Sequence, residues 1–173
     1  MKVGMKEYGS NTASHDKSLV YEYLDALNIP FESYKHEPVF TVKEADELDI
    51  HMEGQYCKNL FLKDKKGKHH YLVIMPQCQQ FRFKELETEL NVSKLSFGSK
   101  EKLFELLGVS PGSVGVFGLI NDEKAQVQVI ISKEFDPTKN ITFHPNSNDE
   151  TLSLTYHDFM KFLGSRNNQL RYL

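Results

Sequence analysis

Residues 57–76 read CKNLFLKDKKGKHHYLVIMP. Two β-like apolar runs, CKNLFLK and HYLVIM, flank the polar string DKKGK, whose glycine suits a turn, and this pattern predicts a β-hairpin. Successive side chains of a strand point to opposite faces. We therefore expect Lys58 on the same face as Leu60 and Leu62, which are apolar, and Asn59 on the other face.

Helices are predicted on both sides of the hairpin, where apolar residues recur with helical spacing next to capping residues. Short β-like runs, VQVIIS, ITF and LSLT, follow in the second half of the chain. Strands and helices interleave without a regular βαβ rhythm, which indicates a single α+β domain with a mixed β-sheet wrapped by helices. The expected helices begin at Asp16, at Thr41 with Glu44 in a capping box, at about Phe83 (ending at Leu90), at the Ser99 cap (ending at Gly108) and at the Thr155 cap.

The composition is that of one globular domain. The 173 residues are 39% hydrophobic and carry a net charge of -3, so any RNA contact must come from a local basic patch. Residues 1–15 lack periodicity and are predicted to form a flexible arm, which leaves 16–173 as the domain. A polar N-terminus and the lack of a long apolar run favour a cytoplasmic protein without a membrane partner.

Several catalytic signatures are absent from the sequence. It contains no Walker loop, GxGxxG after a strand, HExxH or GxSxG. It also shows no metal-ligand cluster, so we expect neither a metal nor another cofactor. Cys57 and Cys78 are expected to be free thiols, and a cysteine nucleophile is disfavoured because no base is placed beside Cys57.

Four residues remain as candidates for chemistry, each with a structural alternative. Lys58 either extends to solvent at a strand end or holds its ammonium at the rim of a pocket, where it would attract a phosphate or an ester carbonyl. His144 lies where a β-like run ends, which suits a pocket edge, but a lone histidine is often structural. The same alternatives apply to His36. Asn59 either contacts substrate or satisfies a neighbouring loop.

Two further segments could border a site. The glycine-rich stretch 109–122, VSPGSVGVFGLIND, is predicted to be a loop that forms a site wall. The hairpin is the most basic part of the chain, which is typical of a solvated turn but also offers phosphate contacts if RNA binds. Those candidate contacts are Lys63, Lys65, Lys66 and Lys68, with Arg166 and Arg171 from the C-terminal segment.

Four ordered blocks together resemble the YbaK-like aminoacyl-tRNA editing family. They are KHEPVFTVKEA (35–45), residues 57–76, LSFGSKEKLFELLGVSPGSVGVFGLIND (95–122) and FHPNSNDETLSL (143–154). The chain looks most similar to the freestanding ProXp-ala (PrdX-like) branch, which resembles the insertion editing domain of prolyl-tRNA synthetases. The resemblance implies a mixed sheet wrapped by helices and hydrolysis, in trans, of alanyl-tRNA(Pro). Its implied partners are the acceptor end of mischarged tRNA(Pro) and prolyl-tRNA synthetase, with no DNA.

The resemblance also implies roles for particular residues. The family lysine falls on Lys58, followed by Asn59, and the family histidine falls on His144, with Asn146 beside it. Water would be the nucleophile, Lys58 would bind the terminal phosphate or the carbonyl oxygen, and His144 and Asn146 would order the pocket. His36 joins the expected substrate-binding residues.

The glycine-rich loop departs from the family pattern. The family carries GxxxP, but the string from Gly112 is GSVGV, so Val116 replaces the proline and Gly115 replaces a usual threonine. Gly112, Gly115, Val116 and Gly118 are expected to line the substrate pocket, with a changed shape. Deacylation of cysteinyl-, seryl- or threonyl-tRNA therefore remains an alternative, as does a non-catalytic paralogue that binds tRNA or a synthetase.

Overall fold

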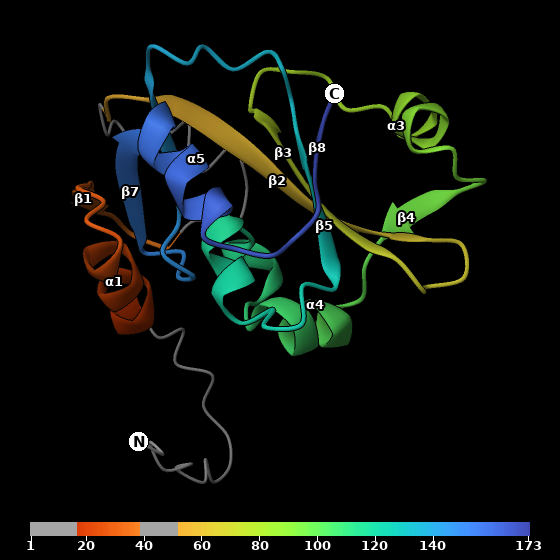
Figure 1. Ribbon diagram of the computed structural model, residues 1–173, viewed down its shortest axis with the longest axis horizontal. Helices are drawn as coiled ribbons and strands as arrows, with labels where there is room; N and C mark the ends of the chain where they lie inside the picture. Colours follow the sequence, from red (N-terminus) through yellow and green to blue (C-terminus); the bar gives the residue numbers. More distant parts are fainter. Residues whose placement is uncertain (1–16, 39–51) are drawn as a thin grey trace, which may run out of the picture.

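The computed structural model describes residues 17–38 and 52–173. These residues form one mixed sheet in the order β1-β7-β6-β2-β3-β5-β8, with β4 paired to β2 off this path (Figure 1). The predicted α+β class is confirmed. The strands are β1 (Glu32–Lys35), β2 (Gln55–Asp64), β3 (His70–Pro76), β4 (Leu95–Phe97), β5 (Val127–Ile131), β6 (Asn140–Phe143), β7 (Glu150–Thr155) and β8 (Leu170–Tyr172).

The predicted hairpin is confirmed as the centre of the sheet. Strands β2 and β3 are antiparallel with Lys58 opposite Met75 and Lys63 opposite His70. Gly67 adopts φ +65° in the turn, a conformation that glycine reaches without a Cβ penalty. Strand β5 extends the sheet in parallel beside β3, and β6 does so beside β2.

The predicted helices that fall on described residues are also confirmed. Ser99 caps α4 by accepting from the Lys102 amide, and Thr155 caps α5 by accepting from the Asp158 amide. The expected capping box at Thr41 and the expected N-terminal arm lie outside the described residues. The helices are α1 (Lys17–Ala26), α3 (Phe83–Leu90), α4 (Lys100–Leu107) and α5 (Tyr156–Gly164), with short 3₁₀ helices η1 (Pro111–Ser113) and η2 (Val116–Ile120).

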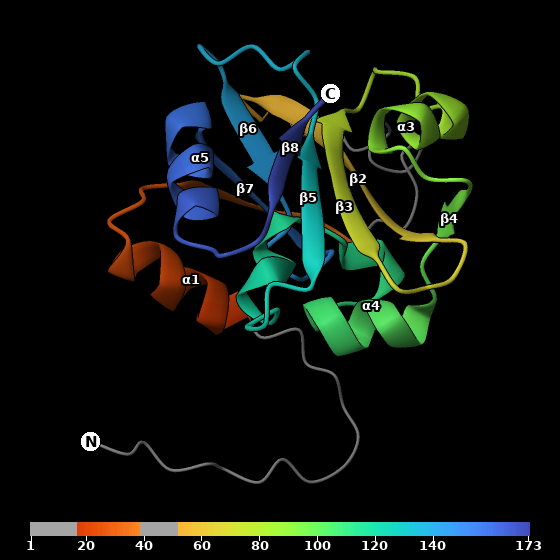
Figure 2. The same cartoon turned by 45° about the vertical axis from the view of Figure 1, so that its right-hand side comes forward.

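The two faces of the sheet are covered differently. The inner face packs with α1, α4, α5 and η2 into one large core cluster, in which Phe117, Phe143 and Phe159 are fully or almost fully buried. On the outer face a smaller cluster joins Leu62 and Ile130 to helix α3. Figures 1 and 2 accordingly show α3 on the opposite side of the molecule from α1.

The outer face is apolar over one half and polar over the other. Under α3 it carries Leu60, Leu62, Val73, Met75 and Ile130. Beside them, β6 and β7 alternate apolar residues on the inner face with Thr142, His144, Thr151 and Ser153 on the outer face, as their pairing register requires. We call the second group the polar half. Lys58 lies near the boundary, because it shares the outer face with Leu60.

Three short strands were not predicted from the sequence, namely β1, β4 and β8. Strands β1 and β8 are mostly exposed edge strands, and only one residue of each is partly buried. The stretch 109–122 was predicted as a loop, yet it folds into η1 and η2. Its apolar residues Val116, Phe117 and Leu119 are fully buried in the core, which explains why this glycine-rich stretch is ordered. Within the described part of the chain, no helix is long and apolar enough to cross a bilayer.

Candidate active site

One edge of β2 is only partly paired. On that edge β6 pairs with Gln55 and Tyr56, and β4 pairs with 62–64. Among the described strands, residues 57–60 therefore have no partner there. We call this stretch the open edge of β2.

The backbone of Asn59 faces the open edge. Tyr56 O accepts from Gln77 N at 2.9 Å, and Asp64 N donates to His69 O at 3.1 Å, so the even-numbered residues of β2 bond toward β3. Because hydrogen bonding alternates along an antiparallel strand, the N–H and C=O of Asn59 point away from β3, toward the open edge. Gly98 N donating to Phe61 O at 2.9 Å shows the same direction one step further along. The open edge thus offers an amide donor and a carbonyl acceptor.

A cavity of about 390 Å³ lies against the open edge. Its wall combines residues of β2 and β4, the first turn of α4 and the segment around η1, so it joins Asn59 to the glycine-rich stretch predicted as a site wall. The side-chain oxygen Oδ1 of Asn59 is buried without a hydrogen-bond partner. The cavity is lined by Asn59, Leu60, Phe61, Phe97, Gly98, Lys100, Leu103, Pro111 and Val114.

Two histidines meet through a threonine on the polar half. His36 Nε2 lies 2.9 Å from Thr151 Oγ1, which lies 3.4 Å from His144 Nδ1. The two imidazole rings have centroids 5.7 Å apart. His36 and His144 were proposed from sequence, whereas Thr151 was not, although the polar alternation along β6 and β7 indicates it.

The hydrogen bonds define the tautomers of both histidines. His144 Nδ1 lies 2.8 Å from the carbonyl oxygen of Glu150, and His36 Nδ1 lies 2.9 Å from that of Glu37. Since a carbonyl can only accept, each Nδ1 carries the proton. The Nε2 atom of neutral His144 then keeps its lone pair, and no partner for it is recorded among the described residues.

The surroundings of His144 keep it neutral. Burial lowers its pKa, the hydrogen bond to Glu150 O opposes this shift, and the nearby charge of His36 lowers the pKa further. The net pKa is below the ordinary histidine value of 6.5. At neutral pH the imidazole can therefore accept a hydrogen bond from water.

Glu150 fixes the carbonyl that holds His144. Its carboxylate is 2% exposed and accepts from Lys17 at 3.1 Å, from Tyr21 at 2.5 Å and from Ser33. Burial alone would raise the pKa of Glu150, but hydrogen bonds from these donors bring it below the ordinary value. Helix α1 and strand β1 are thereby tied to β7 directly behind His144. No pattern in the sequence indicates this role of Glu150.

The ammonium of Lys58 is held by a backbone carbonyl, and no carboxylate partner is recorded for it among residues 17–38 and 52–173. Its Nζ donates to the carbonyl oxygen of Gln79 at 2.9 Å. The Gln79 side chain in turn accepts from Ser132 at 2.6 Å, which anchors the turn after β3 to the end of β5. Lys58 and His144 each lie two residues past the paired residues Tyr56 and Thr142, on the same face. Because β2 and β6 are parallel, Lys58 and His144 lie at the same level of two neighbouring strands, Lys58 near the start of β2 and His144 just past the end of β6.

Only some residues of the glycine-rich stretch lie at the site. A Cβ on Gly115 would meet only His144 O, at 3.6 Å, so there is room beside His144 where the family has threonine. Val116 is fully buried in the core, and its side chain points away from the site. A Cβ on Gly118 would lie 2.9 Å from Leu107 Cβ, so this glycine allows η2 to pack on α4. Gly112 lies in η1, between the cavity residues Pro111 and Val114.

Asn146 supports the turn that follows His144. It is 4% exposed, adopts φ +61° and donates from Nδ2 to Phe117 O at 3.4 Å. Asparagine tolerates this left-handed conformation better than most residues. Asn146 thus connects the turn after β6 to η2.

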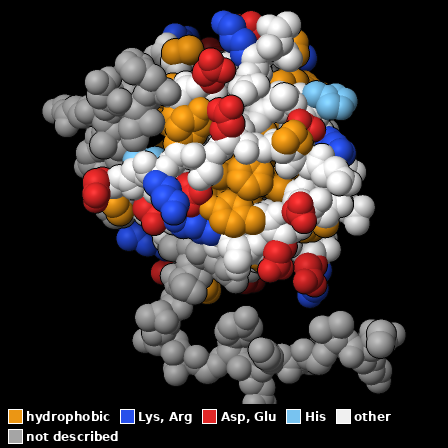
Figure 3. All heavy atoms as spheres, turned by 90° about the vertical axis from the view of Figure 1, so that its left-hand side faces the viewer, with side chains coloured by type: hydrophobic (Ala, Val, Ile, Leu, Met, Phe, Trp, Pro, Cys, Tyr) orange, Lys and Arg blue, Asp and Glu red, His pale blue; other side chains and the backbone are white. Residues whose placement is uncertain are grey.

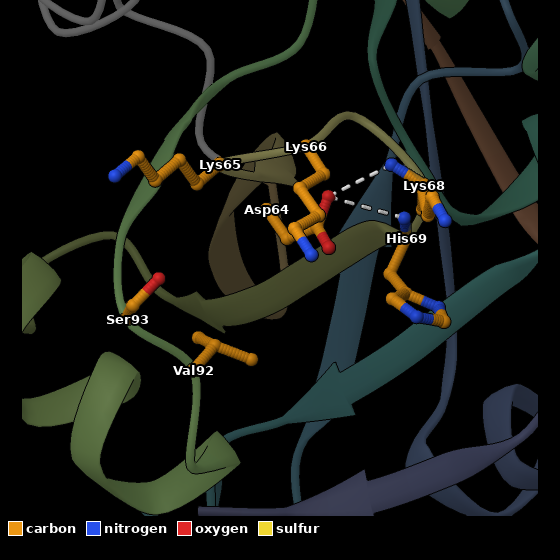
Figure 4. A pocket seen from close by; sticks show the side chains of 7 residues that line it. All are labelled: Asp64, Lys65, Lys66, Lys68, His69, Val92 and Ser93. Carbon is orange, nitrogen blue, oxygen red and sulfur yellow. Dashed lines mark hydrogen bonds between the residues drawn. The ribbon is translucent and has the colours of Figure 1, made fainter.

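The basic hairpin lies at the other end of β2 from Lys58. Figure 4 shows Lys65, Lys66 and Lys68 around Asp64, whose Oδ1 accepts from the backbone amides of Lys68 at 2.8 Å and His69 at 3.3 Å. At about 3.3 Å per residue, the five residues from Lys58 to Lys63 span roughly 17 Å. The structure does not bring the hairpin lysines and Lys58 into one pocket.

Other charged residues are mixed or already engaged. Figure 3, which views the side where α1 and β1 lie, shows acidic and basic side chains interspersed around hydrophobic ones. Arg166 donates to Tyr23 OH at 2.6 Å and stacks on its ring, so it is a weaker phosphate contact than its sequence position indicates.

Cysteine and metal chemistry find little support in the described residues. Both cysteines are free, as predicted. Burial raises the pKa of Cys57, which disfavours its thiolate. No group of three or more potential metal ligands occurs among residues 17–38 and 52–173.

Residues 36–162 match the aminoacyl-tRNA editing domain family. The chain therefore belongs to this family, a class of hydrolases that deacylate tRNA. The match includes the open edge of β2, the glycine-rich stretch and the polar half, so the site lies entirely within the family domain.

Individual relatives narrow the resemblance. The chain is 36% identical over 155 residues to the prolyl-tRNA editing protein ProX of Acetoanaerobium sticklandii, covering 90% of this chain and 94% of that protein. It is 33% identical over 144 residues to the prolyl-tRNA synthetase associated domain-containing protein 1 of Mus musculus, covering 81% and 85%. A crystal structure of a protein proposed as a trans-editing enzyme for prolyl tRNA synthetase shares the fold, with a TM-score of 0.68, 18% identity and coverage of 95% and 98%.

Proposed function

We propose that this protein edits prolyl-tRNA in trans, by hydrolysing the ester of alanyl-tRNA(Pro). The similarity to ProX supports action on tRNA(Pro), and the similarity to the synthetase-associated proteins supports prolyl-tRNA synthetase as a partner. The single observation that carries the chemistry is the placement of His144 and Lys58 at the same level of adjacent parallel strands and on the same face, with the proton of His144 on Nδ1.

In this proposal a water molecule attacks the ester carbonyl. His144 Nε2 accepts a hydrogen bond from the water and orients it, while Lys58 attracts the carbonyl oxygen or the terminal phosphate. The new bond joins water oxygen to the carbonyl carbon, and the bond to the ribose oxygen breaks. The ribose oxygen leaves with a proton that originates from the water. The N–H of Asn59 at the open edge is a further donor for the developing oxyanion.

The pocket around Gly115 sets the acyl preference in this proposal. A small wall beside His144 accommodates alanine, whereas exclusion of proline by bulk is worth only about 1–3 kcal/mol per methylene. Recognition of the tRNA must therefore contribute to selectivity. Because Gly115 leaves more room than the family threonine, cysteinyl, seryl and threonyl esters are the competing substrates.

The decisive experiment compares alanyl-tRNA(Pro) with prolyl-tRNA(Pro) and with the other mischarged tRNAs. We expect rapid hydrolysis of the alanyl ester only, with a loss of about 10²- to 10³-fold in Lys58→Ala, as for removal of one oxyanion donor. Lys139→Ala, at an exposed lysine just before β6 that lies outside the candidate phosphate contacts, is the matched control. Preference for another ester would change the substrate, and hydrolysis of none would favour a non-catalytic tRNA- or synthetase-binding role.

Recognition of tRNA is tested separately by moving the tRNA(Pro) acceptor stem onto an unrelated tRNA. If the stem contributes as proposed, transplanting it should confer deacylation on the new alanyl-tRNA. A deacylation rate that ignores the identity of the stem would exclude this contribution.

A further inference from the structure

Three consecutive residues at the start of β7 contact both histidines of the polar half. Asp149 O accepts from the backbone amide of His36 at 3.0 Å, and Glu150 O lies 2.8 Å from His144 Nδ1, whose proton it accepts. Thr151 Oγ1 lies between the two rings. The orientation of both imidazoles therefore depends on how firmly this short segment is held.

Helix α1, which lies next to β1 and β7 (Figure 1), binds the acidic side chains of the same segment. Lys17 Nζ lies 2.5 Å from Asp149 Oδ1 and 3.1 Å from Glu150 Oε2, so one ammonium bridges two successive carboxylates. One helical turn further on, Tyr21 OH donates to Glu150 Oε1 at 2.5 Å. A carboxylate as buried as that of Glu150 stays ionised only with such partners, so the contact is specific.

Lys17 also balances the charges that act on His144. Burial lowers the pKa of His144, as does the charge of His36, whereas the hydrogen bond to Glu150 O and the charge of Asp149 raise it. The hydrogen bond from Lys17 lowers the pKa of Asp149 and keeps this carboxylate charged. Without Lys17, the negative charge of Asp149 would act on the imidazole uncompensated.

We propose that Lys17 and Tyr21 of α1 are positioning residues for His144. They act through the carboxylates of Asp149 and Glu150 and do not themselves meet the ester. By holding the segment behind His144, they keep its Nδ1 proton on the Glu150 carbonyl and its Nε2 aimed as an acceptor. The inference rests on the proposed function, in which Nε2 of His144 orients the attacking water.

The first test removes one donor from this arrangement. Tyr21→Phe keeps the ring, which stacks on Phe31 at 5.5 Å, but loses the hydroxyl that binds Glu150. We expect kcat for alanyl-tRNA(Pro) to fall about 2- to 10-fold, with KM changed less than about twofold. Tyr23→Phe is the matched control on the same helix, because the Tyr23 hydroxyl accepts from Arg166 at 2.6 Å. It should keep the wild-type kcat, and thermal unfolding checks that both variants fold.

The second test reads the pKa of His144 by NMR titration of isotope-labelled histidines and needs no hydrolysis. The resonance is identified by its loss in His144→Asn. Lys17→Met should raise this pKa by about 0.3–1, and Asp149→Asn should lower it by a similar amount. Loosening of the structure alone would expose His144 and raise its pKa in both variants. Lys161→Met, at an exposed lysine of α5, is the control and should leave the pKa unchanged.

The outcomes separate this inference from the proposed function. A wild-type kcat in Tyr21→Phe would overturn the inference even if alanyl-tRNA(Pro) is hydrolysed. So would pKa shifts of His144 that are absent, or of the same sign, in Lys17→Met and Asp149→Asn. Opposite shifts without hydrolysis of any ester would support the hold of α1 on His144 and refute the proposed catalysis.

Discussion

The two halves of the outer face share the same strand geometry but carry different side chains. Under α3, side chains such as Leu62 and Ile130 are fully buried and hold a helix in place. Across β6 and β7, the same alternation presents Thr142, His144 and Thr151, which hold one another through hydrogen bonds or bond the neighbouring backbone. The apolar half stabilises the fold, and the polar half positions groups for chemistry. The difference lies in which residues occupy the alternate positions and not in the backbone.

The largest effect is expected from truncating a buried side chain in the apolar half. Leu62→Ala should lower the free energy of unfolding by about 2–5 kcal/mol, because it leaves a cavity under α3. The deacylation rate of the folded protein should stay at the wild-type level. Denaturant unfolding and initial rates well below the melting temperature measure the two quantities. A rate loss in fully folded protein would show that the two halves are not separable.

The second prediction concerns pH and the polar half. Neutral His144 is the form required, and burial lowers its pKa below 6.5, so activity should rise with pH and level off before neutrality. Below that pKa the rate should fall about tenfold per pH unit. His144→Asn should lose this acidic limb along with most activity. Initial rates corrected for spontaneous ester hydrolysis give the profile, and a midpoint at or above the ordinary histidine value would contradict the assignment.

A smaller effect is expected from Thr151→Val, which removes the hydroxyl between the two histidines while keeping the shape of the side chain. The rate should fall about 2- to 10-fold, as for loss of one or two modest hydrogen bonds, with a shifted acidic midpoint. Ser153→Ala is the matched control, because Ser153 occupies the same face but donates to Glu53 O at 2.5 Å. It should affect stability only. Equal rate losses in both variants would indicate a general structural defect.

The smallest effect is expected from Gly115→Ala. The new methyl group would meet His144 O at 3.6 Å, an ordinary contact, so the fold should be unchanged. Narrowing the wall should reduce deacylation of seryl and threonyl esters relative to alanyl by about two- to fivefold, less than a full methylene in a closed pocket achieves. Competition between esters on the same tRNA measures the ratio. An unchanged ratio would place the acyl group elsewhere.

The fold was predictable where the sequence carries a long periodic signal. The hairpin, α3, α4 and α5 combine regular apolar spacing with turn or capping residues, and each was found as expected. Strands β1, β4 and β8 have three or four residues each, too few to establish a period, and pairing with their neighbours determines them. In residues 109–122, the glycines and the proline favoured the prediction of a loop, although the apolar residues between them are buried and form a 3₁₀ helix.

Sequence reasoning reached some residues of the candidate site but not the ones that support them. Lys58, Asn59 and His144 stand out by residue type, and their positions on β2 and β6 follow from alternation. Glu150 and Tyr21 were not identifiable, because they act through a contact between α1 and β7 that joins residues 129 positions apart. Whether Arg166 is free for phosphate also depends on tertiary structure, since Tyr23 comes from the other end of the chain.

The open edge of β2 also bears on solubility and self-association. Exposed strand edges at the margin of a sheet can recruit strands from other molecules and start aggregation. Here residues 57–60, which have no partner on this edge among the described strands, lie in the interior of the sheet, between β6 and β4, which limit the approach of a second chain. A recess bordered by strands on both sides leaves little room for a strand of another molecule to pair with β2. The molecule can therefore expose backbone hydrogen-bonding groups to a ligand without offering a template for fibrils.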